Sequence, residues 1–314
     1  MSKTADRYVA ITGGVGGAKL ALGLSKLLAP NELCFAVNTG DDFEHLGLHI
    51  SPDIDTITYT LAGASNKKLG WGREGETWQF IETLGELGGD DWFRLGDKDM
   101  ALHIRRRSLL EQGLSLTEVT SSITQAMGIN HNVLPMTNDQ VRTIVHTQTG
   151  DALPFQHYFV RDRCAPAVAR FEFAGINQAQ PNPLLLEQLT QCRAVIICPS
   201  NPYVSVDPLL KLPGMRDAIV ASGVPVVAVS PIVSGIAIKG PAAKMMAELK
   251  VPNTAVSVAE HYGDLLHGFV IDEQDAALGA DIKVPTLCAQ SVMHTLDDRV
   301  QLAQSVLDFI TELS

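Results

Sequence analysis

The 314-residue sequence has no run of about 18 consecutive apolar residues, so we expect no membrane-spanning helix. Its first residues, 1–7, are polar and lack the apolar stretch of a signal peptide. Cysteine is scarce: the five residues include no C-x-x-C pair, which argues against a disulfide framework and a cysteine-based metal or redox site. These absences predict a cytoplasmic protein with no membrane partner.

Basic residues are also few, because 24 lysines and arginines stand against 35 aspartates and glutamates, for a net charge of −11. Proteins that hold a nucleic-acid backbone usually carry a basic face, so we expect no nucleic-acid partner. The densest basic run, Arg105 to Arg107, fits either a solvated helix face or a clamp for phosphate on a small ligand. The charge pattern therefore favours small-molecule substrates.

The first forty residues have the order of a nucleotide-binding sheet. Residues 8–12 form an apolar run that ends at glycines, residues 18–28 have helical spacing, and residues 33–37 form a second apolar run. Strand, loop, helix and strand in this order are typical of the opening of a doubly wound fold. We predict a single Rossmann-like α/β domain over residues 1–314, with a mostly parallel sheet.

The rest of the chain continues this pattern after an interruption. The spacing of apolar residues over about 65–135 is mainly helical and predicts an inserted helical or mixed segment. Further strands are predicted at 141–146, 158–161, 194–198, 224–230 and 269–272, and further helices at 241–249 and 300–313.

A glycine-rich loop follows the first predicted strand and comprises Gly13, Gly14, Gly16 and Gly17, with Lys19 behind them. Small residues let the backbone approach a phosphate, and the N–H groups of the following helix then face its charge. The loop matches neither the strict dinucleotide pattern nor a Walker A motif. We interpret it as a nucleotide-binding loop, the alternative being a tight turn that only packs a helix on the sheet.

Acidic residues gather just after the second predicted strand, at Asp41, Asp42, Asp53 and Asp55. Mg²⁺ prefers one or two carboxylates together with phosphate oxygens and water, and a cation would relieve the repulsion among crowded acids. The alternative is that Asp53 caps the helix after Pro52 and that Asp41 and Asp42 are solvated. We favour a metal site.

Three further segments are weaker candidates. Arg94 could hold a phosphate or stack on a flat ring, and Asp97 could orient a substrate hydroxyl, although both also fit an ordinary charged turn before a helix. Ser200 and Asn201, after a predicted strand, could contact a base or a phosphate. Lys239, beside the start of a predicted helix, is a plausible anion-binding residue.

Taken in order, these segments resemble the 2-phospho-L-lactate transferase family, also called the CofD family. The resemblance runs over about residues 8–245 and is specific as a series, although each motif is weak alone. The matching residues are the loop Gly13 to Lys19, Asn38-Thr-Gly-Asp-Asp42, Ser51-Pro-Asp-Ile-Asp-Thr56, Leu95-Gly-Asp-Lys-Asp99, Pro135-Met-Thr-Asn-Asp139, Pro199-Ser-Asn-Pro202 and Ser230-Pro-Ile-Val-Ser-Gly235.

The resemblance implies an Mg²⁺-dependent transferase of coenzyme F420 biosynthesis. Such an enzyme moves a phosphorylated three-carbon acid from a guanosine diphosphate ester to the deazaflavin Fo and releases GMP. The family pattern implies that Asp55 and Arg94 contact the deazaflavin and that Mg²⁺ binds near Asp42 and Asp55. It also implies that the glycine loop, with the region of Ser200 and Asn201, holds the guanosine diphosphate.

In this chemistry the ribityl hydroxyl attacks phosphorus, and Asp42 or Asp55 could accept its proton. Trp71, Trp78 and Trp92 could flank the flat deazaflavin, although ordinary packing also explains them. We therefore expect Asp55→Ala to lose turnover while the fold remains.

Two other readings stay open. A related branch of the family binds a nucleotide sugar without catalysis, but its acidic motif should read Asp-Asp-Gly-Gly-Ser-Ser-Gly, whereas Asp42 is followed here by Phe-Glu-His. A nicotinamide-dependent dehydrogenase would need an acid near the position of Asn38. The sequence does not distinguish phospholactate, phosphoenolpyruvate and phosphoglycerate as the transferred acid, and we expect a homodimer because such folds commonly form one.

Overall fold

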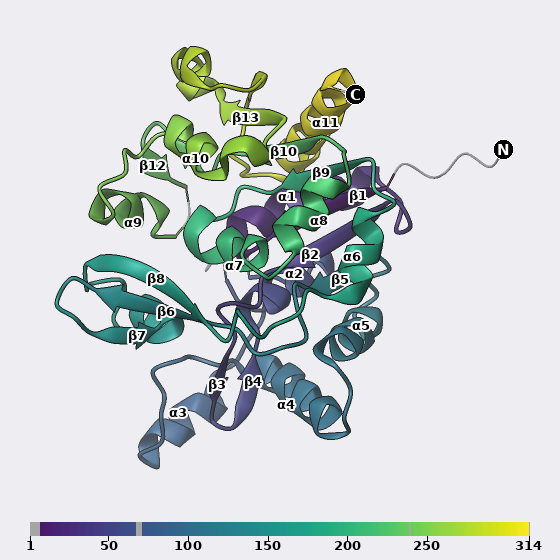
Figure 1. Cartoon of the computed structure of the whole chain (residues 1–314). Helices are drawn as coiled ribbons and strands as arrows, with labels where there is room; N and C mark the ends of the chain where they lie inside the picture. Colours follow the sequence, from purple (N-terminus) through teal and green to yellow (C-terminus); the bar gives the residue numbers. More distant parts are fainter. Residues whose placement is uncertain (1–6, 67–70, 239, 314) are drawn as a thin grey trace.

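A parallel sheet of seven strands forms the centre of this computed structural model, which describes residues 7–66, 71–238 and 240–313 (Figure 1). The strand order is β14-β13-β10-β9-β1-β2-β5, and all neighbouring strands pair in parallel. The strands are Tyr8–Thr12 (β1), Leu33–Val37 (β2), Asn132–Pro135 (β5), Ala194–Ile197 (β9), Val226–Val229 (β10), Gly268–Asp272 (β13) and Thr286–Ala289 (β14).

Both faces are buried along β1, β2, β9 and β10, which is why these strands are almost entirely apolar rather than apolar at alternate positions. In β1, Val9 and Ile11 face one hydrophobic core, and Tyr8 and Ala10 face the other. Helices that supply the first core are α6 (Pro183–Leu189), α7 (Asp207–Leu210), α8 (Met215–Ala221), α9 (Ala242–Glu248) and α10 (Ala255–Tyr262). Those that supply the second are α1 (Gly14–Leu27), α2 (Pro52–Leu61), α5 (Leu116–Ala126) and α11 (Leu296–Leu313). The predicted doubly wound α/β fold is therefore confirmed.

Helices α3 (Gln79–Glu86), α4 (Asp97–Glu111) and α5 lie between α2 and β5, where the sequence predicts a mainly helical insertion. Its predicted end near residue 135 overlaps β5, which belongs to the central sheet. Helix α3 lies at the periphery of the molecule, away from the central sheet (Figure 1). No helix among the described residues is long and apolar enough to cross a membrane.

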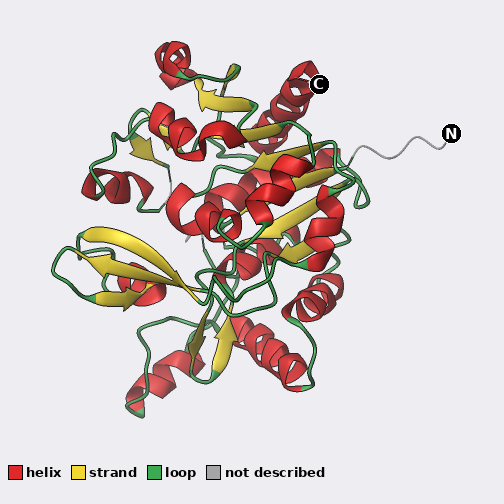
Figure 2. Cartoon of the chain, viewed as in Figure 1, coloured by secondary structure: helices red, strands yellow, loops and turns green. Residues whose placement is uncertain are grey.

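Smaller sheets project from this core (Figure 2). One is the antiparallel sheet β7-β6-β8, built from Ala152–Pro154, Arg142–Thr147 and Val168–Ala174. The others are the pairs Phe43–His45 with Leu48–Ile50 (β3 and β4) and Ile232–Val233 with Ile236–Ala237 (β11 and β12).

The strand predicted at 158–161 is wrong, because His157–Arg161 form a π-helical turn between β7 and β8. The apolar run at this point is only a few residues long, and so short a run does not distinguish a strand from a buried helical turn. Tyr158 is fully buried within this turn. The turn brings its neighbours to the cavity described below.

Helices α1 and α11 pack closely at Gly23, which is buried between them. A Cβ atom at this position would overlap the backbone carbonyl oxygen of Arg299 and lie 3.2 Å from the Cβ of Ala303. The absence of a side chain therefore sets the separation of the two helices.

We predict that Gly23→Ala lowers the free energy of unfolding by about 1–3 kcal/mol, despite the higher helix propensity of alanine, because α11 must move away from α1. Urea denaturation measures this change. Lys26→Ala, at an exposed position of the same helix, is the control and should stay within about 0.5 kcal/mol of the wild type. Equal stability of Gly23→Ala and the wild type would contradict the packing argument.

Candidate functional site

A cavity of about 630 Å³ lies beyond the carboxyl ends of the central strands. Strand β1 has β2 on one side and β9 on the other, so the chain reverses its direction of winding between β1 and β9. Open α/β sheets bind ligands in the crevice at such a point. The glycine loop after β1 and residues 199–201 after β9 both line the cavity. Its volume is in the range of small-molecule sites, roughly 300–1,000 Å³.

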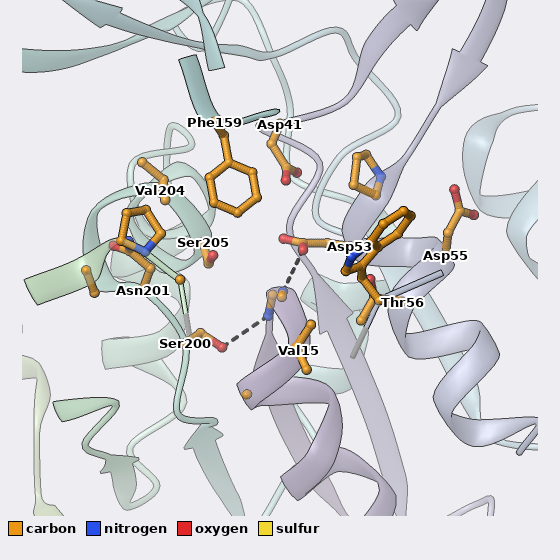
Figure 3. A pocket seen from close by; sticks show the side chains of 18 of the residues that line it. Val15, Asp41, Asp53, Asp55, Thr56, Phe159, Ser200, Asn201, Val204 and Ser205 are labelled. Carbon is orange, nitrogen blue, oxygen red and sulfur yellow. Dashed lines mark hydrogen bonds between the residues drawn. The ribbon is translucent and has the colours of Figure 1, made fainter. Parts of the chain in front are cut away.

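The glycine loop forms the start of α1 and faces the cavity (Figure 3). The N–H of Gly13 donates to Ser200 Oγ at 3.2 Å, so the two loops on either side of the reversal are bonded to each other. A Cβ on Gly16 would lie 2.5 Å from the carbonyl oxygen of Pro199. The predicted loop residues Gly13, Gly14 and Gly16 therefore line a surface that backbone groups provide.

The other residues predicted to contact the nucleotide do not all line the cavity. Ser200 and Asn201 line the cavity, whereas Gly17 packs beneath it, where a Cβ would meet Thr12 and Ser200. Lys19 also lines the cavity, and its Nζ donates to the carbonyl oxygen of Met293 at 2.7 Å. Lys239 lies outside the described residues.

Two buried aspartates, Asp41 and Asp53, face the cavity beside the glycine loop (Figure 3). The side-chain amide of Asn38 donates to both, to Asp41 Oδ1 at 3.1 Å and to Asp53 Oδ2 at 2.9 Å. Asp53 Oδ1 also accepts from the N–H of Gly14 at 2.5 Å. The predicted convergence of acids after the second strand and glycines after the first is thus present.

Burial gives these acids unusual pKa values. Burial raises the pKa of Asp53 to about 6, while hydrogen bonds from Asn38 and Gly14 limit the rise. Burial, followed by the charges of Asp53 and Asp42, raises the pKa of Asp41 well above its usual value of 3.8. Two crowded carboxylates that resist ionisation are a donor set that a divalent cation would satisfy.

The acids that we expected from the sequence to share the metal, Asp42 and Asp55, are not the pair that the structure brings together at the cavity. Asp42 is not part of its lining, because Oδ2 accepts from Ser51 Oγ at 2.7 Å and from His49 Nε2 at 3.0 Å. Successive side chains in the loop after β2 point different ways, so Asp41 faces the cavity and Asp42 lies behind it. Asp42 contributes its charge from that position, raising the pKa values of Asp41 and Asp53.

Asp55 does line the cavity, but both of its oxygens contact the guanidinium of Arg106. Arg106 is 1% exposed, and it also donates to His103 Nδ1 at 3.2 Å. Since arginine can only donate, Nδ1 of His103 accepts and its proton lies on Nε2, which is 3.4 Å from Asp99 Oδ1. This ion pair leaves Asp55 poorly suited to bind a cation.

Arg106 belongs to the basic run that we interpreted as a solvated face or a phosphate clamp, and it is neither. Its position on α4, seven residues after Asp99 and three after His103, places it on the helix face that packs against α2. That spacing is the only signal in the sequence for its burial. Asp55→Ala would leave this guanidinium buried without its partner, so the expectation that the fold tolerates the change needs correction.

Aromatic side chains also line the cavity. Trp71, Trp92 and Phe93 line it from the inserted segment, Tyr59 from α2, and Phe155 and Phe159 from the residues around the π-helical turn. The rings of Phe155 and Phe159 stack at 5.5 Å between centroids. Trp78, the third tryptophan that we considered, does not line the cavity. The centre of its ring lies 6.4 Å from that of Trp71.

Arg94 lines the cavity, with its guanidinium 4.8 Å from the centre of the Trp78 ring and 3.6 Å from the carboxylate of Glu82. Asp97 is not part of the lining. Its carboxylate accepts from Thr77 Oγ1 and from the N–H of Phe80, at the start of α3, so it caps that helix. The ordinary-turn interpretation therefore describes Asp97 better than the substrate-binding one.

The described residues contain no group of three or more His, Cys, Asp or Glu side chains arranged to hold a metal ion. This pattern does not suit a structural zinc or calcium site, which needs several protein ligands. It does suit Mg²⁺, which commonly takes one or two carboxylates and completes its octahedron with substrate phosphates and water.

Comparisons with known proteins find relatives over nearly the whole chain. A family model described as 2-phospho-L-lactate transferase CofD matches residues 8–307. A Streptomyces coelicolor protein named phosphoenolpyruvate transferase is 38% identical over 315 residues, covering 98% of this chain and 99% of that protein. The 2-phospho-L-lactate transferase of Methanosarcina mazei is 38% identical over 269 residues, covering 86% and 88%. Among solved structures, a UPF0052-family protein of Bacillus halodurans has a TM-score of 0.63 at 15% identity, covering 96% and 99%, a likeness of fold alone.

The raised pKa of Asp53 predicts a pH-dependent stability in the metal-free protein. A carboxyl whose folded pKa of about 6 exceeds its unfolded value stabilises the fold below about pH 4 and loses that contribution as pH rises through about 6. Relative to Asp53→Asn, the wild type should therefore lose up to about 3 kcal/mol of unfolding free energy between pH 4 and pH 7. Urea denaturation at a series of pH values in a chelator measures this difference, and a difference independent of pH would contradict the assignment.

The buried ion pair predicts unequal effects of two substitutions. Asp55→Ala should lower the free energy of unfolding by about 3–5 kcal/mol, because the charge of Arg106 stays buried. The double variant Asp55→Ala/Arg106→Met should recover part of this loss, since no uncompensated charge remains. Thermal and urea unfolding of the four proteins of this cycle test the point, and additive losses would show that the two residues do not interact.

Proposed function

This chain belongs to the CofD family of transferases of coenzyme F420 biosynthesis, and from that premise we propose that it moves a phosphorylated three-carbon acid from a guanosine diphosphate ester to the deazaflavin Fo, releasing GMP. One observation carries the proposal. A single cavity is lined both by the start of a helix, with its backbone N–H groups, and by aromatic rings. Such a cavity suits an anionic diphosphate and a flat heterocycle side by side.

The diphosphate of the donor is proposed to lie against residues 13–16, where the N-terminus of α1 favours negative charge. Ser200 and Asn201 would border the nucleotide from β9. The deazaflavin would lie between Trp71, Trp92 and Phe159, within reach of Arg94 and Asp55. This arrangement would direct the ribityl hydroxyl of the acceptor toward the phosphorus that carries the acid.

Asp53 is the residue best placed to hold Mg²⁺, because it contacts the glycine loop on which the diphosphate would lie. Asp41 lies beside it, so these two acids replace the pair Asp42 and Asp55 in the proposed site. Bound Mg²⁺ would neutralise charge on the diphosphate oxygens and on the leaving GMP.

The attacking hydroxyl must lose a proton as its oxygen bonds to phosphorus and the bond to GMP breaks. Four aspartates line the cavity, namely Asp41, Asp53, Asp55 and Asp99. Arg106 engages Asp55, while Tyr59 and His103 engage Asp99. Among the described residues, the carboxylate of Asp41 accepts hydrogen bonds from Asn38 and Gln156 but forms no ion pair. With Asp53 as the residue that would hold the cation, we assign Asp41 the role of proton acceptor.

The names of the relatives differ in the acid that they transfer, and the donor of this chain is accordingly proposed as a class: phosphoenolpyruvyl, phospholactyl or phosphoglyceryl esters. A homodimer remains an expectation. The dehydrogenase reading is not favoured, because the side chain of Asn38 is turned to the acids and not to a ribose position.

We predict that the protein converts Fo and at least one of the three guanylated acids to the coupled product and GMP in the presence of Mg²⁺, and that EDTA removes this activity. Asp53→Asn should lower turnover at least about 100-fold, since it removes the charge proposed to hold the cation. Mass spectrometry of the products measures both effects. Asp97→Asn, which lies outside the cavity, is the control and should retain turnover.

No GMP release with any of the three donors would refute the transferase proposal and favour the non-catalytic, nucleotide-binding alternative. Full activity of Asp53→Asn would instead refute only the metal assignment.

A further inference from the structure

The positive charges on the cavity wall differ in how far they are already committed. Lys19 donates to the carbonyl oxygen of Met293, and Arg94 lies between Glu82 and the ring of Trp78. Arg163 also lines the cavity, and its side chain makes no hydrogen bond or ion pair with any residue that the structure describes. Among the described arginines and lysines of the lining, it is therefore the one whose charge is uncommitted.

The backbone of Arg163 is in an unfavourable conformation. Its φ is +50°, and the next residue, Cys164, has φ +57°. Residues with a Cβ avoid this left-handed region, which glycine adopts without strain. The conformation is fixed by its neighbours, because the N–H of Asp162 bonds the carbonyl of His157 at 2.8 Å and the N–H of Cys164 bonds that of Tyr158 at 2.8 Å. Arginine is therefore present at a position where glycine would be less strained.

The segment that carries Arg163 is anchored to the acidic side of the site. Gln156, just before the π-helical turn, donates to the backbone oxygen of Asp41 at 3.3 Å and to its Oδ2 at 3.4 Å. Phe159, within the turn, faces the cavity near Asp41 (Figure 3). Arg163 lines the same cavity four residues after Phe159, on the segment that Gln156 attaches to Asp41.

Charge balance explains what this arginine would bind. The proposed donor carries a carboxylate as well as two phosphate charges, while the cavity wall already holds four aspartates. The start of α1 and the proposed cation would bind the phosphates, which leaves the carboxylate of the donor in need of its own partner. A planar guanidinium matches a carboxylate with two parallel hydrogen bonds, which a lysine ammonium does not.

We infer that Arg163 binds the carboxylate of the three-carbon acid and thereby selects acid donors. The inference rests on the proposed transferase function, and it assigns a residue to the part of the donor that distinguishes it from GDP. It predicts an interaction between one side chain and one substrate group, which can be removed from either partner.

The test is a cycle of two enzymes and two donors. Wild type and Arg163→Ala are assayed with the guanylated acid and with the same ester whose carboxylate is replaced by a carboxamide, at saturating Fo and Mg²⁺. With the acid, Arg163→Ala should lower kcat/KM by about 10- to 100-fold, whereas with the carboxamide it should change little. Arg161→Ala is the matched control, because Arg161 is exposed, pairs with Asp162 and does not line the cavity. It should behave as the wild type with both donors.

Arg163→Gly separates binding from folding. Glycine relieves the left-handed backbone, so this variant should unfold at the same temperature as the wild type or higher, and yet lose activity with the acid donor as Arg163→Ala does. The affinity for GDP, measured by calorimetry, should remain unchanged in both variants. Arg163→Lys should retain more activity than Arg163→Ala but less than the wild type, since lysine keeps the charge but cannot form the two parallel hydrogen bonds of a guanidinium.

Three results would overturn the inference. Arg163→Ala could lower kcat/KM equally with both donors. It could reduce the affinity for GDP by as much as it lowers kcat/KM with the acid donor. It could also leave kcat/KM with the acid donor unchanged. The first two would make Arg163 a general or phosphate-binding residue. Failure of the proposed function itself is distinct, because wild-type protein would then release no GMP from either donor.

Discussion

The geometry of the site depends on the hydrogen bonds that the carboxylate of Asp53 accepts. It accepts from the N–H of Gly14 at the start of α1 and from the side-chain amide of Asn38 after β2, while it belongs to the first turn of α2. A Cβ on Gly13 would lie 2.7 Å from Asp53 Oδ2, so the glycine and the acid require each other. Three elements that are separate in the sequence thus meet at one side chain, and the cavity opens where they meet.

The cost of this arrangement is an excess of buried negative charge, and the fold manages it in two ways. Asp55 is compensated within the protein by Arg106, a buried pair whose removal from one side would leave an unpaired charge. Among the described residues, no cationic side chain forms an ion pair with Asp41 or Asp53, and burial raises the pKa values of both. Acids that stay uncompensated at a cavity wall are the natural place for a cation that arrives with a diphosphate substrate.

Much of the fold could be predicted because its signals are local. Apolar runs that end at glycine or polar residues identified β1, β2, β9, β10 and β13, and burial on both faces explains why those runs do not alternate. Short runs were less informative, as the π-helical turn at His157–Arg161 illustrates. There the outcome depends on how Tyr158 packs against distant residues, which the local pattern does not contain.

The site could be predicted as a region but not as a set of contacts. The sequence placed acids beside the glycine loop, yet whether Asp41 or Asp42 turns inward depends on Ser51 and His49, which engage Asp42 from β4 and the residue before α2. Likewise, the partner of Asp55 is some fifty residues away on α4. Side-chain direction in a loop and pairing between distant helices are tertiary facts, and no residue pattern within either segment encodes them.

The position of Arg163 suggests how one scaffold could serve different donors. The glycine loop, Asp53 and the residues after β9 all belong to the central sheet and its first connections, and they would contact the parts that all guanylated donors share. Arg163 lies instead between β7 and β8 of the separate antiparallel sheet. On the inferred role, contacts to the three-carbon acid come from an element whose changes leave the phosphate-binding core intact. Selection of the acid and activation of the diphosphate would then be separable properties of the fold, since different backbone elements hold them.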